Sequence, residues 1–449
     1  SRGRSAASSN GRSLNGYESG MKTAPSPALV ASIARRFGLE ADDLEVGPLG
    51  RGLINDSFLV RTASGRWVLQ RLNGQVFPDP EGIMANLAQL AAHLARQPRI
   101  DLVWPSLRTL ASGATWTRDE AGDLWRMMSF LPGQPLAAIR TPGQAAEVGR
   151  LLGQFHRAVA DLEPAHLRVT LPGFHVTPAY LRQFDRVLAA GVPPRVQGTE
   201  DMGTADTLIG VSNNGDTGAV GSVSAAGSAG SLGSGVAKDS VGMMIADPLP
   251  VGDALRSDPD LGEALDFLAR RREGLAEVED ARQAGLIPER VVHGDPKLDN
   301  LLFDATGQRA VALIDLDTVQ PGLTLHDIAD CLRSCCNRQG ETAQPAAIGF
   351  DLAVCRPLLA AYATASQGLL NPTEIALLYP AIRLLPLELG LRFLTDHLLG
   401  NRWFRVTAPG QNLARAKVQF ALVAAIERQE TEIRQEIVAC FGQRPAQRY

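Results

Sequence analysis

Residues 291–303 read VVHGDPKLDNLLF, and the apolar run that ends at Asp315 follows a short turn containing Gly307. Two apolar runs joined by such a turn are typical of a β-hairpin. This hairpin would place Asn300 beside Asp315, and amide and carboxylate oxygens are ligands that Mg²⁺ takes. Asp295, on the loop before the hairpin, lies within reach and is suited to accept or orient a proton. The stretch therefore predicts a metal site with a base beside it.

The same stretch has the spacing of a phosphoryl-transfer site. His293, Asp295 and Asn300 follow the order H-x-D-x-x-x-x-N, and an apolar strand ending in Asp315 comes next. Kinases use this order for their catalytic loop and their metal-binding aspartate. The competing interpretation is a polar turn whose acids only cap backbone amides. The agreement of spacing, hairpin, lobe order and an upstream glycine-rich loop favours an ATP- and Mg²⁺-dependent kinase.

The pattern of elements changes near residue 130. Before it, alternating apolar residues predict a small, strand-dominated unit with one internal helix, and after it long helical patterns dominate. The predicted fold class is α+β, two-lobed and protein-kinase-like, with a nucleotide-binding N-lobe at 26–130, a catalytic and substrate-binding C-lobe at 131–449, and a cleft between them. In the N-lobe we expect helices from Ser26-Pro27 and Asp79-Pro80, and strands at about 44–49, 57–61, 66–72, 101–110 and 124–130.

Two segments lack the composition of a packed core. Residues 1–25 are rich in Ser, Gly and Arg without the apolar stretch of a secretory signal, so we expect a flexible tail. Residues 197–257 contain a low-complexity run of Gly, Ser and Ala that cannot bury enough apolar surface to offset its ordering entropy. We expect this segment to be a disordered insertion in the C-lobe.

The totals exclude several classes of function. The 449 residues carry 44 basic and 48 acidic side chains, a net charge of −4, whereas a nucleic-acid surface needs a strong basic excess. No apolar run approaches the roughly 18 residues that span a bilayer. Five cysteines are too few for a disulfide framework, which favours a reducing, cytoplasmic setting. We therefore expect a small-molecule partner and neither nucleic acid nor membrane; the oligomeric state is left open.

The segment HGDPKLDN (293–300), followed by IDLD (314–317), resembles the aminoglycoside phosphotransferase superfamily, which shares the protein-kinase-like fold. Further segments are similar to bacterial N-acetylhexosamine 1-kinases: LGRGLINDSFLV, WVLQRLNGQVFPD, SGATW, IDLDTVQPG and GLRFLTDHL. The resemblance runs from about residue 26 to about 435, apart from the low-complexity segment. It implies that the anomeric hydroxyl of N-acetylglucosamine or N-acetylgalactosamine is phosphorylated.

The resemblance also implies roles for individual residues. Asp295 would be the catalytic base, and Asn300 and Asp315 would hold magnesium. Lys297 would lie near the transferred phosphate, and His293 would brace the loop.

The nucleotide-binding side has an unusual set of residues. Gly50, Arg51, Gly52 and Asn55 form a loop with two of the three glycines that cover phosphates. Asn55 occupies the third place, and Asn tolerates positive φ better than most residues. Kinases pair a Lys on the third strand with a Glu on the following helix. Here the strand carries Gln70 and Arg71 and the helix from 83 to 95 has no acid, so the candidate phosphate anchors are Arg51, Arg71 and Lys297.

Residues for the acceptor come from a helix near the C-terminus. Glu388, Arg392 and Asp396 lie four residues apart and share one helix face, which by itself favours a solvated salt-bridge ladder. The resemblance instead implies that Arg392 contacts the sugar. Asp317, two residues after Asp315, would point the same way on an alternating strand, as a structural hydrogen-bond acceptor or as a ligand.

Two other functions compete with a sugar kinase. The acceptor could be cationic, as in kinases for aminoglycosides, choline or homoserine, but such acceptors need an acidic or aromatic cage. Only five Tyr and five Trp are present, and the proposed pocket has a basic residue, which ranks this lower. A nucleotide-binding pseudokinase scaffold would explain the missing Lys–Glu pair. The intact set of Asp295, Asn300 and Asp315 argues against a scaffold.

Overall fold

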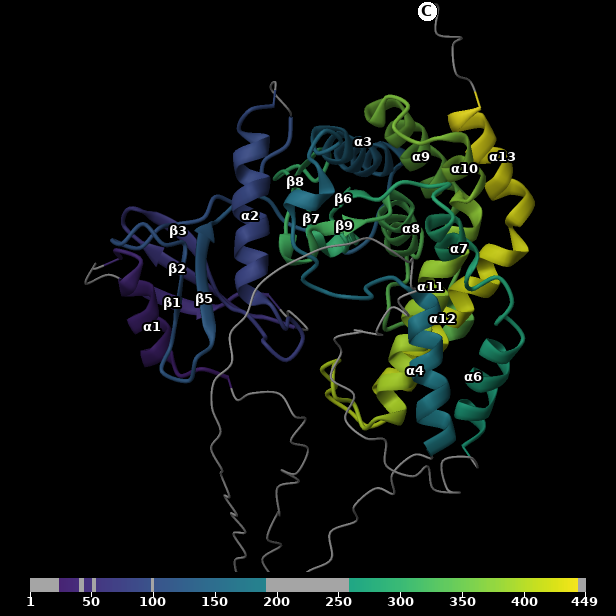
Figure 1. The fold of residues 1–449 in the computed structure, drawn as a ribbon, viewed down its shortest axis with the longest axis horizontal. Helices are drawn as coiled ribbons and strands as arrows, with labels where there is room; N and C mark the ends of the chain where they lie inside the picture. The colour runs from purple at the N-terminus through teal and green to yellow at the C-terminus, as the bar shows by residue number, and fades with distance from the viewer. Residues whose placement is uncertain (1–23, 40–43, 51–53, 98–100, 191–257, 443–449) are drawn as a thin grey trace, which may run out of the picture.

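The structure is a computed structural model that describes residues 24–39, 44–50, 54–97, 101–190 and 258–442. It has a small lobe built on a β-sheet and a larger, mostly helical lobe, which confirms the predicted two-lobed α+β fold (Figure 1). The segment expected to be an insertion, 197–257, and nearly all of the expected tail lie outside the described residues. Within the described part of the chain, no helix is both long and apolar enough to cross a membrane.

The small lobe is an antiparallel sheet covered on one face by a helix. The sheet has five strands in the order β1-β2-β3-β5-β4. Helix α1 starts where predicted, because Ser26 Oγ accepts from the backbone N–H of Leu29 at 3.2 Å and Pro27 occupies the first turn. A separate apolar core joins α1 to the sheet. The bounds are α1 (Pro27–Arg36), β1 (Glu45–Pro48), β2 (Asp56–Thr62), β3 (Gly65–Arg71), β4 (Trp116–Arg118) and β5 (Leu124–Ser129).

One predicted strand is wrong. The segment 101–110 forms only isolated bridges, from Val103 to Ala312 in the large lobe and from Leu107 to Met128 in the small one. Pro105 interrupts the segment and cannot donate to a β-ladder. The segment therefore crosses between the lobes as an extended connection, and β4, which pairs with β5, supplies the fifth strand.

Helix α2 (Pro80–Leu94) stands between the two lobes (Figure 1). By sequence it falls within the predicted N-lobe, but its apolar face belongs to the large lobe's core rather than to that of the sheet. Asn86 fixes this position, because its amide nitrogen donates to the carbonyl oxygens of Arg168 at 2.8 Å and Val319 at 3.0 Å. The helix is thus attached to the large lobe by both packing and hydrogen bonds.

The large lobe packs around α3 and α9, which lie in close contact because Gly149 and Gly153 of α3 face the α9 backbone. The helices are α3 (Pro142–Ala158), α4 (Thr177–Ala190), α6 (Pro259–Ala269), α7 (Glu277–Gln283), α8 (Thr324–Cys335), α9 (Leu352–Ser366), α10 (Pro372–Ala376), α11 (Leu378–Leu398), α12 (Gln411–Arg428) and α13 (Glu430–Phe441).

Two short strand pairs lie on the side of the large lobe that faces the sheet. Strands β6 (Arg290–Val292) and β9 (Gln320–Gly322) pair, and β7 (Leu301–Phe303) pairs with β8 (Ala310–Leu313). The second pair confirms the predicted hairpin, with Gly307 in its turn at φ +67°.

The end of that hairpin differs from the prediction. Strand β8 stops at Leu313, and Asp315 takes a left-handed conformation with φ 62°. Asp317 follows within a short 3₁₀ turn, Leu316–Thr318, so the two acids do not share an alternating strand. The hairpin nevertheless brings the segment next to Asn300, whose carbonyl oxygen accepts from the backbone N–H of Ile314 at 2.9 Å.

The close approach of α3 and α9 gives a test of the packing. A Cβ added at Gly149 would lie 2.0 Å from the carbonyl oxygen of Leu358, so Gly149→Ala must push the helices apart. We expect this change to lower the free energy of unfolding by about 1–3 kcal/mol or more. Gly262→Ala on α6 is the control, because nothing lies within 4 Å of the added methyl group, and it should stabilise the protein by about 0.5–1 kcal/mol. Urea unfolding followed by tryptophan fluorescence measures both; equal effects would contradict the packing.

Candidate active site

A cavity of about 1440 Å³ lies between the lobes and contains most of the residues predicted to form the site. Its small-lobe wall is formed by β3, β5 and the start of the glycine-rich loop, and its large-lobe wall by the segment around the β7–β8 hairpin and by α11. Arg71 does not line the cavity, and Arg51 and Gly52 lie outside the described residues. The predicted residues that line it are Gly50, Asn55, Gln70, Asp295, Lys297, Asn300, Asp315, Asp317 and Arg392.

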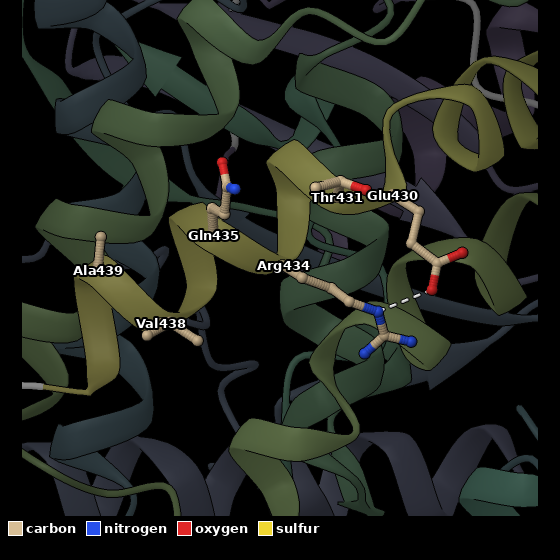
Figure 2. Close-up of a pocket in the computed structure, with 6 residues that line it drawn as sticks. All are labelled: Glu430, Thr431, Arg434, Gln435, Val438 and Ala439. Carbon is tan, nitrogen blue, oxygen red and sulfur yellow. Dashed lines mark hydrogen bonds and ion pairs between the residues drawn. The ribbon is translucent and has the colours of Figure 1, made fainter.

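A second hollow lies elsewhere, on the outer helix α13 (Figure 2). All of its lining residues come from this helix, including the exposed Val438 and the ion pair of Arg434 with Glu430 at 2.7 Å. No other charged residue lines it. Its two charged groups are paired with each other, and the residues predicted to form the site line the other cavity, so the site is assigned to the cavity between the lobes.

Asp295 and Asn300 form a small hydrogen-bonded unit. The amide nitrogen of Asn300 donates to the backbone carbonyl of Asp295 at 2.7 Å and to its Oδ2 at 3.1 Å. Lys297 Nζ also donates to Oδ2, at 2.5 Å. With its nitrogen held in this way, Asn300 has its amide oxygen left to bind a cation, and Asp295 has Oδ1 left to accept a proton.

The loop that carries Asp295 is held by Asp327, a buried residue of α8 that the sequence reasoning missed. Its carboxylate accepts from the backbone N–H groups of His293 at 2.7 Å and Gly294 at 2.8 Å, and from His156 Nε2 at 2.8 Å. Burial by itself would raise the pKa of Asp327, but the hydrogen bond and the charge of His156 lower it. A charged carboxylate therefore fixes the loop. The local sequence does not mark it out, because α8 mixes apolar residues with a second acid, Asp330, and with Arg333.

His293 braces the loop from the other side. Its Nε2 donates to the carbonyl oxygen of Ile314 at 3.1 Å, and its Nδ1 accepts from the backbone N–H of Asp295 at 3.3 Å. Burial lowers the pKa of His293, which favours the neutral ring that can make both contacts. Gly294 is required here, because it has φ +86° and an added Cβ would lie 2.7 Å from the carbonyl oxygen of Thr318.

Acidic side chains gather on the large-lobe wall. Burial, followed by the nearby charge of Asp317, raises the pKa of Asp315 to about 7. Burial disfavours the charge of Lys297, but the carboxylates of Asp295 and Asp315 outweigh this and raise the pKa of Lys297. Carboxylate and amide oxygens around an excess of negative charge are the donor set that fits a divalent cation such as Mg²⁺. Asn300 and Asp315 are therefore suited to hold one.

The small-lobe wall reaches across the cavity to Asp317. Asn55 Nδ2 donates to Asp317 Oδ2 at 2.7 Å, and Arg126 on β5 forms an ion pair with Asp317 Oδ1. Arg126 also donates to Gln70 Oε1 on the neighbouring strand, at 2.7 Å from Nη2. Asp317 thus has a structural role as the acceptor that joins the lobes. Arg126 was not among the predicted anchors, because its place opposite Gln70 depends on the pairing of β3 with β5.

Arg71 points away from this network. Successive side chains of a strand face opposite sides, so Arg71 lies on the side opposite Gln70. Its Nη2 lies 2.6 Å from Asp56 Oδ2, and its Nη1 lies 3.5 Å from Asp123 Oδ2. Of the three residues predicted as phosphate anchors, Lys297 is therefore the only described one that lines the cavity.

The predicted salt-bridge ladder on α11 is wrong. Glu388 and Asp396 are buried, and among the described residues neither forms an ion pair with Arg392. Asp396 instead accepts from the backbone N–H groups of residues 402–404 at 2.7–3.0 Å. The reason is that α11 crosses the interior of the lobe, so the face carrying these residues meets other elements instead of solvent.

Glu388 pairs with His175, whose Nδ1 lies 2.8 Å from its Oε1, and accepts from Thr177 Oγ1 at 2.5 Å. Burial disfavours the charge on both members of the pair, but their mutual attraction prevails. It raises the pKa of His175 and lowers the pKa of Glu388 to about 2. This carboxylate is therefore already neutralised by the protein.

Arg392 lies among aromatic rings at the end of the cavity that is lined by α4 and α11. The centre of its guanidinium is 5.6 Å from the ring of Phe174, 5.1 Å from that of Tyr180 and 5.6 Å from that of Phe404. Within the described part of the chain, no carboxylate pairs with it and no acceptor takes a hydrogen bond from it. The guanidinium is thus a positive charge at the cavity with its donors available.

Comparisons with known proteins bear on the fold and on the family. Among solved structures, the chain is similar to a microcompartment-associated aminopropanol kinase, with 16% identity, a TM-score of 0.53, and 91% of this chain and 99% of that chain covered. It is likewise similar to an aminoglycoside phosphotransferase from Alicyclobacillus acidocaldarius, with 16% identity, a TM-score of 0.50, and 94% and 99% covered. These likenesses show a shared fold. The sequence itself matches the phosphotransferase enzyme family over residues 45–206 and 245–363. Because that match covers more than half of the chain, the protein belongs to the phosphotransferase enzyme family.

Proposed function

We propose that the protein is an ATP- and Mg²⁺-dependent small-molecule kinase that phosphorylates the anomeric hydroxyl of an N-acetylhexosamine. The observation that carries the reaction class is the convergence of Asp295, Asn300 and Asp315 on one cavity wall. A base, an amide ligand and a carboxylate ligand are the parts that phosphoryl transfer needs, because catalysis there is mainly positioning and charge stabilisation. A scaffold would need neither the base nor the loop that Asp327 holds in place.

In this proposal Asp295 orients the acceptor hydroxyl and takes its proton at Oδ1, the oxygen that Lys297 and Asn300 leave available. The acceptor oxygen forms a bond to the γ-phosphorus of ATP while the bond to the ADP oxygen breaks. Lys297 stays charged beside the base and can contact the phosphoryl group during transfer. Asn300 and Asp315 would hold Mg²⁺, which, when bound, neutralises charge on the phosphates.

The charged residues around Arg392, where we place the acceptor, support an acceptor without charge. Glu388 is paired with His175, and Asp330 is paired with Arg333 at 2.7 Å, so each of these acids already has a basic partner. Arg392 adds a positive charge that forms no ion pair with a described carboxylate, although it also helps to lower the pKa of Glu388. Hydroxyl and acetamido oxygens of a sugar can accept its hydrogen bonds, whereas an ammonium group would be repelled.

A cationic acceptor remains the second candidate, supported by one observation. The aromatic rings of Phe174, Tyr180 and Phe404 surround the pocket that Arg392 now occupies, and such rings also bind amines. The structurally similar aminopropanol kinase is named for an amino alcohol, which is a cationic acceptor. We rank this candidate lower, because an amine would have to bind these rings in competition with the guanidinium.

The role of Asp295 as base gives the first test. Asp295→Asn keeps the shape of the side chain but cannot take a proton, so we expect the turnover of ADP release to fall by about 100-fold or more. Binding of Mg-ATP, measured by calorimetry, should stay within a few-fold of the wild type, and Asp280→Asn on the exposed face of α7 serves as the control. Near-normal turnover in a folded Asp295→Asn protein would contradict this role.

The proposed metal ligands predict a change in magnesium requirement. Asp315→Asn should raise the Mg²⁺ concentration needed for half-maximal activity by about tenfold or more, because a carboxylate ligand is lost. Titration of activity with Mg²⁺ at saturating ATP measures this, again beside Asp280→Asn. If Asp315→Asn leaves the Mg²⁺ curve unchanged, the metal must be held elsewhere.

The acceptor class is tested with a substrate panel. ADP release should occur with N-acetylglucosamine or N-acetylgalactosamine and be absent with choline, homoserine, aminopropanol and kanamycin. Arg392→Met keeps the packing against the rings but removes the donors, so we expect the KM for the sugar to rise by about 10-fold or more while the KM for ATP is unchanged. Arg270→Met, an exposed arginine of the same lobe, is the control.

Each other result of the panel points to a defined alternative. Preferred turnover of an amine would move the protein to the cationic-acceptor class and would contradict the role given to Arg392. Binding of nucleotide without transfer to any acceptor would favour the scaffold.

A further inference from the structure

The small lobe contains a buried arginine, Arg126, that lines the cavity and has no part in the proposed reaction described above. Arg126 on β5 is 1% exposed and lies directly opposite Gln70 of β3 in the sheet register. In the kinase pattern this part of the sheet carries the lysine that contacts the nucleotide phosphates. Gln70 is uncharged and cannot do this alone, but it places the guanidinium of Arg126 on the cavity wall.

The hydrogen bonds of Arg126 leave one side of its guanidinium open. Nε and Nη2 donate to Gln70 Oε1 at 3.1 and 2.7 Å, and Nη2 also pairs with Asp317 Oδ1. Nη1 is buried and has no hydrogen-bond partner among the described residues. A buried donor without a partner costs free energy, and natural proteins retain such a group where a ligand, an ion or a water completes it.

Arg126 lies where a phosphate group bound in the cavity could contact it from the small lobe. Among the described residues that line the cavity from the small lobe, it is the only basic one. Arg71 is turned away toward Asp56, and Lys297 is on the opposite wall, paired with Asp295. Guanidinium groups bind phosphate oxygens through charge-assisted hydrogen bonds, and Arg keeps its charge when buried.

We propose that Arg126 is the nucleotide-phosphate anchor of this kinase, with Nη1 donating to a phosphate oxygen of ATP in place of the lysine that β3 lacks. Gln70 and Asp317 are positioning residues that hold the guanidinium in the required orientation. The inference rests on the proposed kinase function, because it assumes that a nucleoside triphosphate occupies the cavity. A purely structural alternative is that Arg126 only ties the lobes together through Asp317.

The test compares the affinity for ATP with the affinity for adenosine, measured by calorimetry with excess Mg²⁺ and no acceptor. The phosphate anchor should favour ATP only, so Arg126→Met should reduce the ratio of the two affinities by about tenfold or more. Adenosine binding should change little. Arg61→Met, an exposed arginine on β2 of the same sheet, should leave the ratio unchanged.

Two further variants distinguish binding of phosphate by Arg126 from a purely structural ion pair with Asp317. Arg126→Lys keeps a positive charge for Asp317 but lacks the second guanidinium nitrogen, so we expect a smaller loss in the same ratio, and it decides the question if Arg126→Met does not fold. Asp317→Asn removes the charge partner between the lobes. We expect it to preserve the preference for ATP better than Arg126→Met does.

The outcomes distinguish this inference from the proposed function. A wild-type ratio in folded Arg126→Met or Arg126→Lys would overturn the anchor while leaving the kinase intact. An equal loss of ATP and adenosine binding in Arg126→Met and Asp317→Asn would assign Arg126 to the structural tie. If the wild type binds neither ATP nor ADP, the proposed kinase function itself fails.

Discussion

The repulsion among three carboxylates gathered in the cavity is the constraint around which the site is arranged. Charges in a poorly solvated site must be compensated or neutralised. Lys297 compensates Asp295, and Arg126 with Asn55 compensates Asp317. Asp315 has no hydrogen-bonded cation among the described residues, and burial with the charge of Asp317 raises its pKa to about 7. Asn55 and Arg126 of the small lobe are therefore linked to the large lobe through Asp317.

Buried hydrogen bonds within the large lobe fix the position of the loop that carries Asp295. Asp327 of α8 accepts hydrogen bonds from two consecutive backbone N–H groups of the catalytic loop, and His156 of α3 holds Asp327 in turn. Tyr362 of α9 contacts the other nitrogen of His156, with 2.9 Å between Nδ1 and the hydroxyl oxygen. Three helices that form the core of the lobe thus determine where Asp295 lies. A buried, fully bonded network of this kind holds a group to a single position.

Local sequence patterns predicted much of the fold and the centre of the site. Ser26-Pro27 marked the start of α1, and the spacing of Asn300, Gly307 and Asp315 predicted the hairpin, because capping and turn chemistry are set by neighbouring residues. The failures involve contacts between distant segments. The segment 101–110 alternates like a strand but crosses between lobes.

Within the site, Arg126 could not be predicted for the same reason. It lies opposite Gln70 only because β3 pairs with β5, and the two residues are more than fifty positions apart in the sequence. Asp327 was missed for the same reason, because its partners come from α3 and from the catalytic loop. On α11, helical spacing correctly placed Glu388 and Arg392 on one face. It could not reveal that this face is covered by other parts of the lobe.

The attachment of α2 to the large lobe has a consequence for how the enzyme can open. Helix α2 packs in the apolar core of the large lobe, whereas α1 and most of the buried sheet residues form a separate core. Leu124 at the start of β5 is an exception, because it packs in the large-lobe core. If the lobes separated between these two cores, the sheet would move with α1, while α2 would stay with the large lobe, to which Asn86 binds it. A displacement of α2 away from the large lobe would require breaking that lobe's apolar core. Separation of the sheet from the large lobe would instead break the contacts that Asn55 and Arg126 make with Asp317.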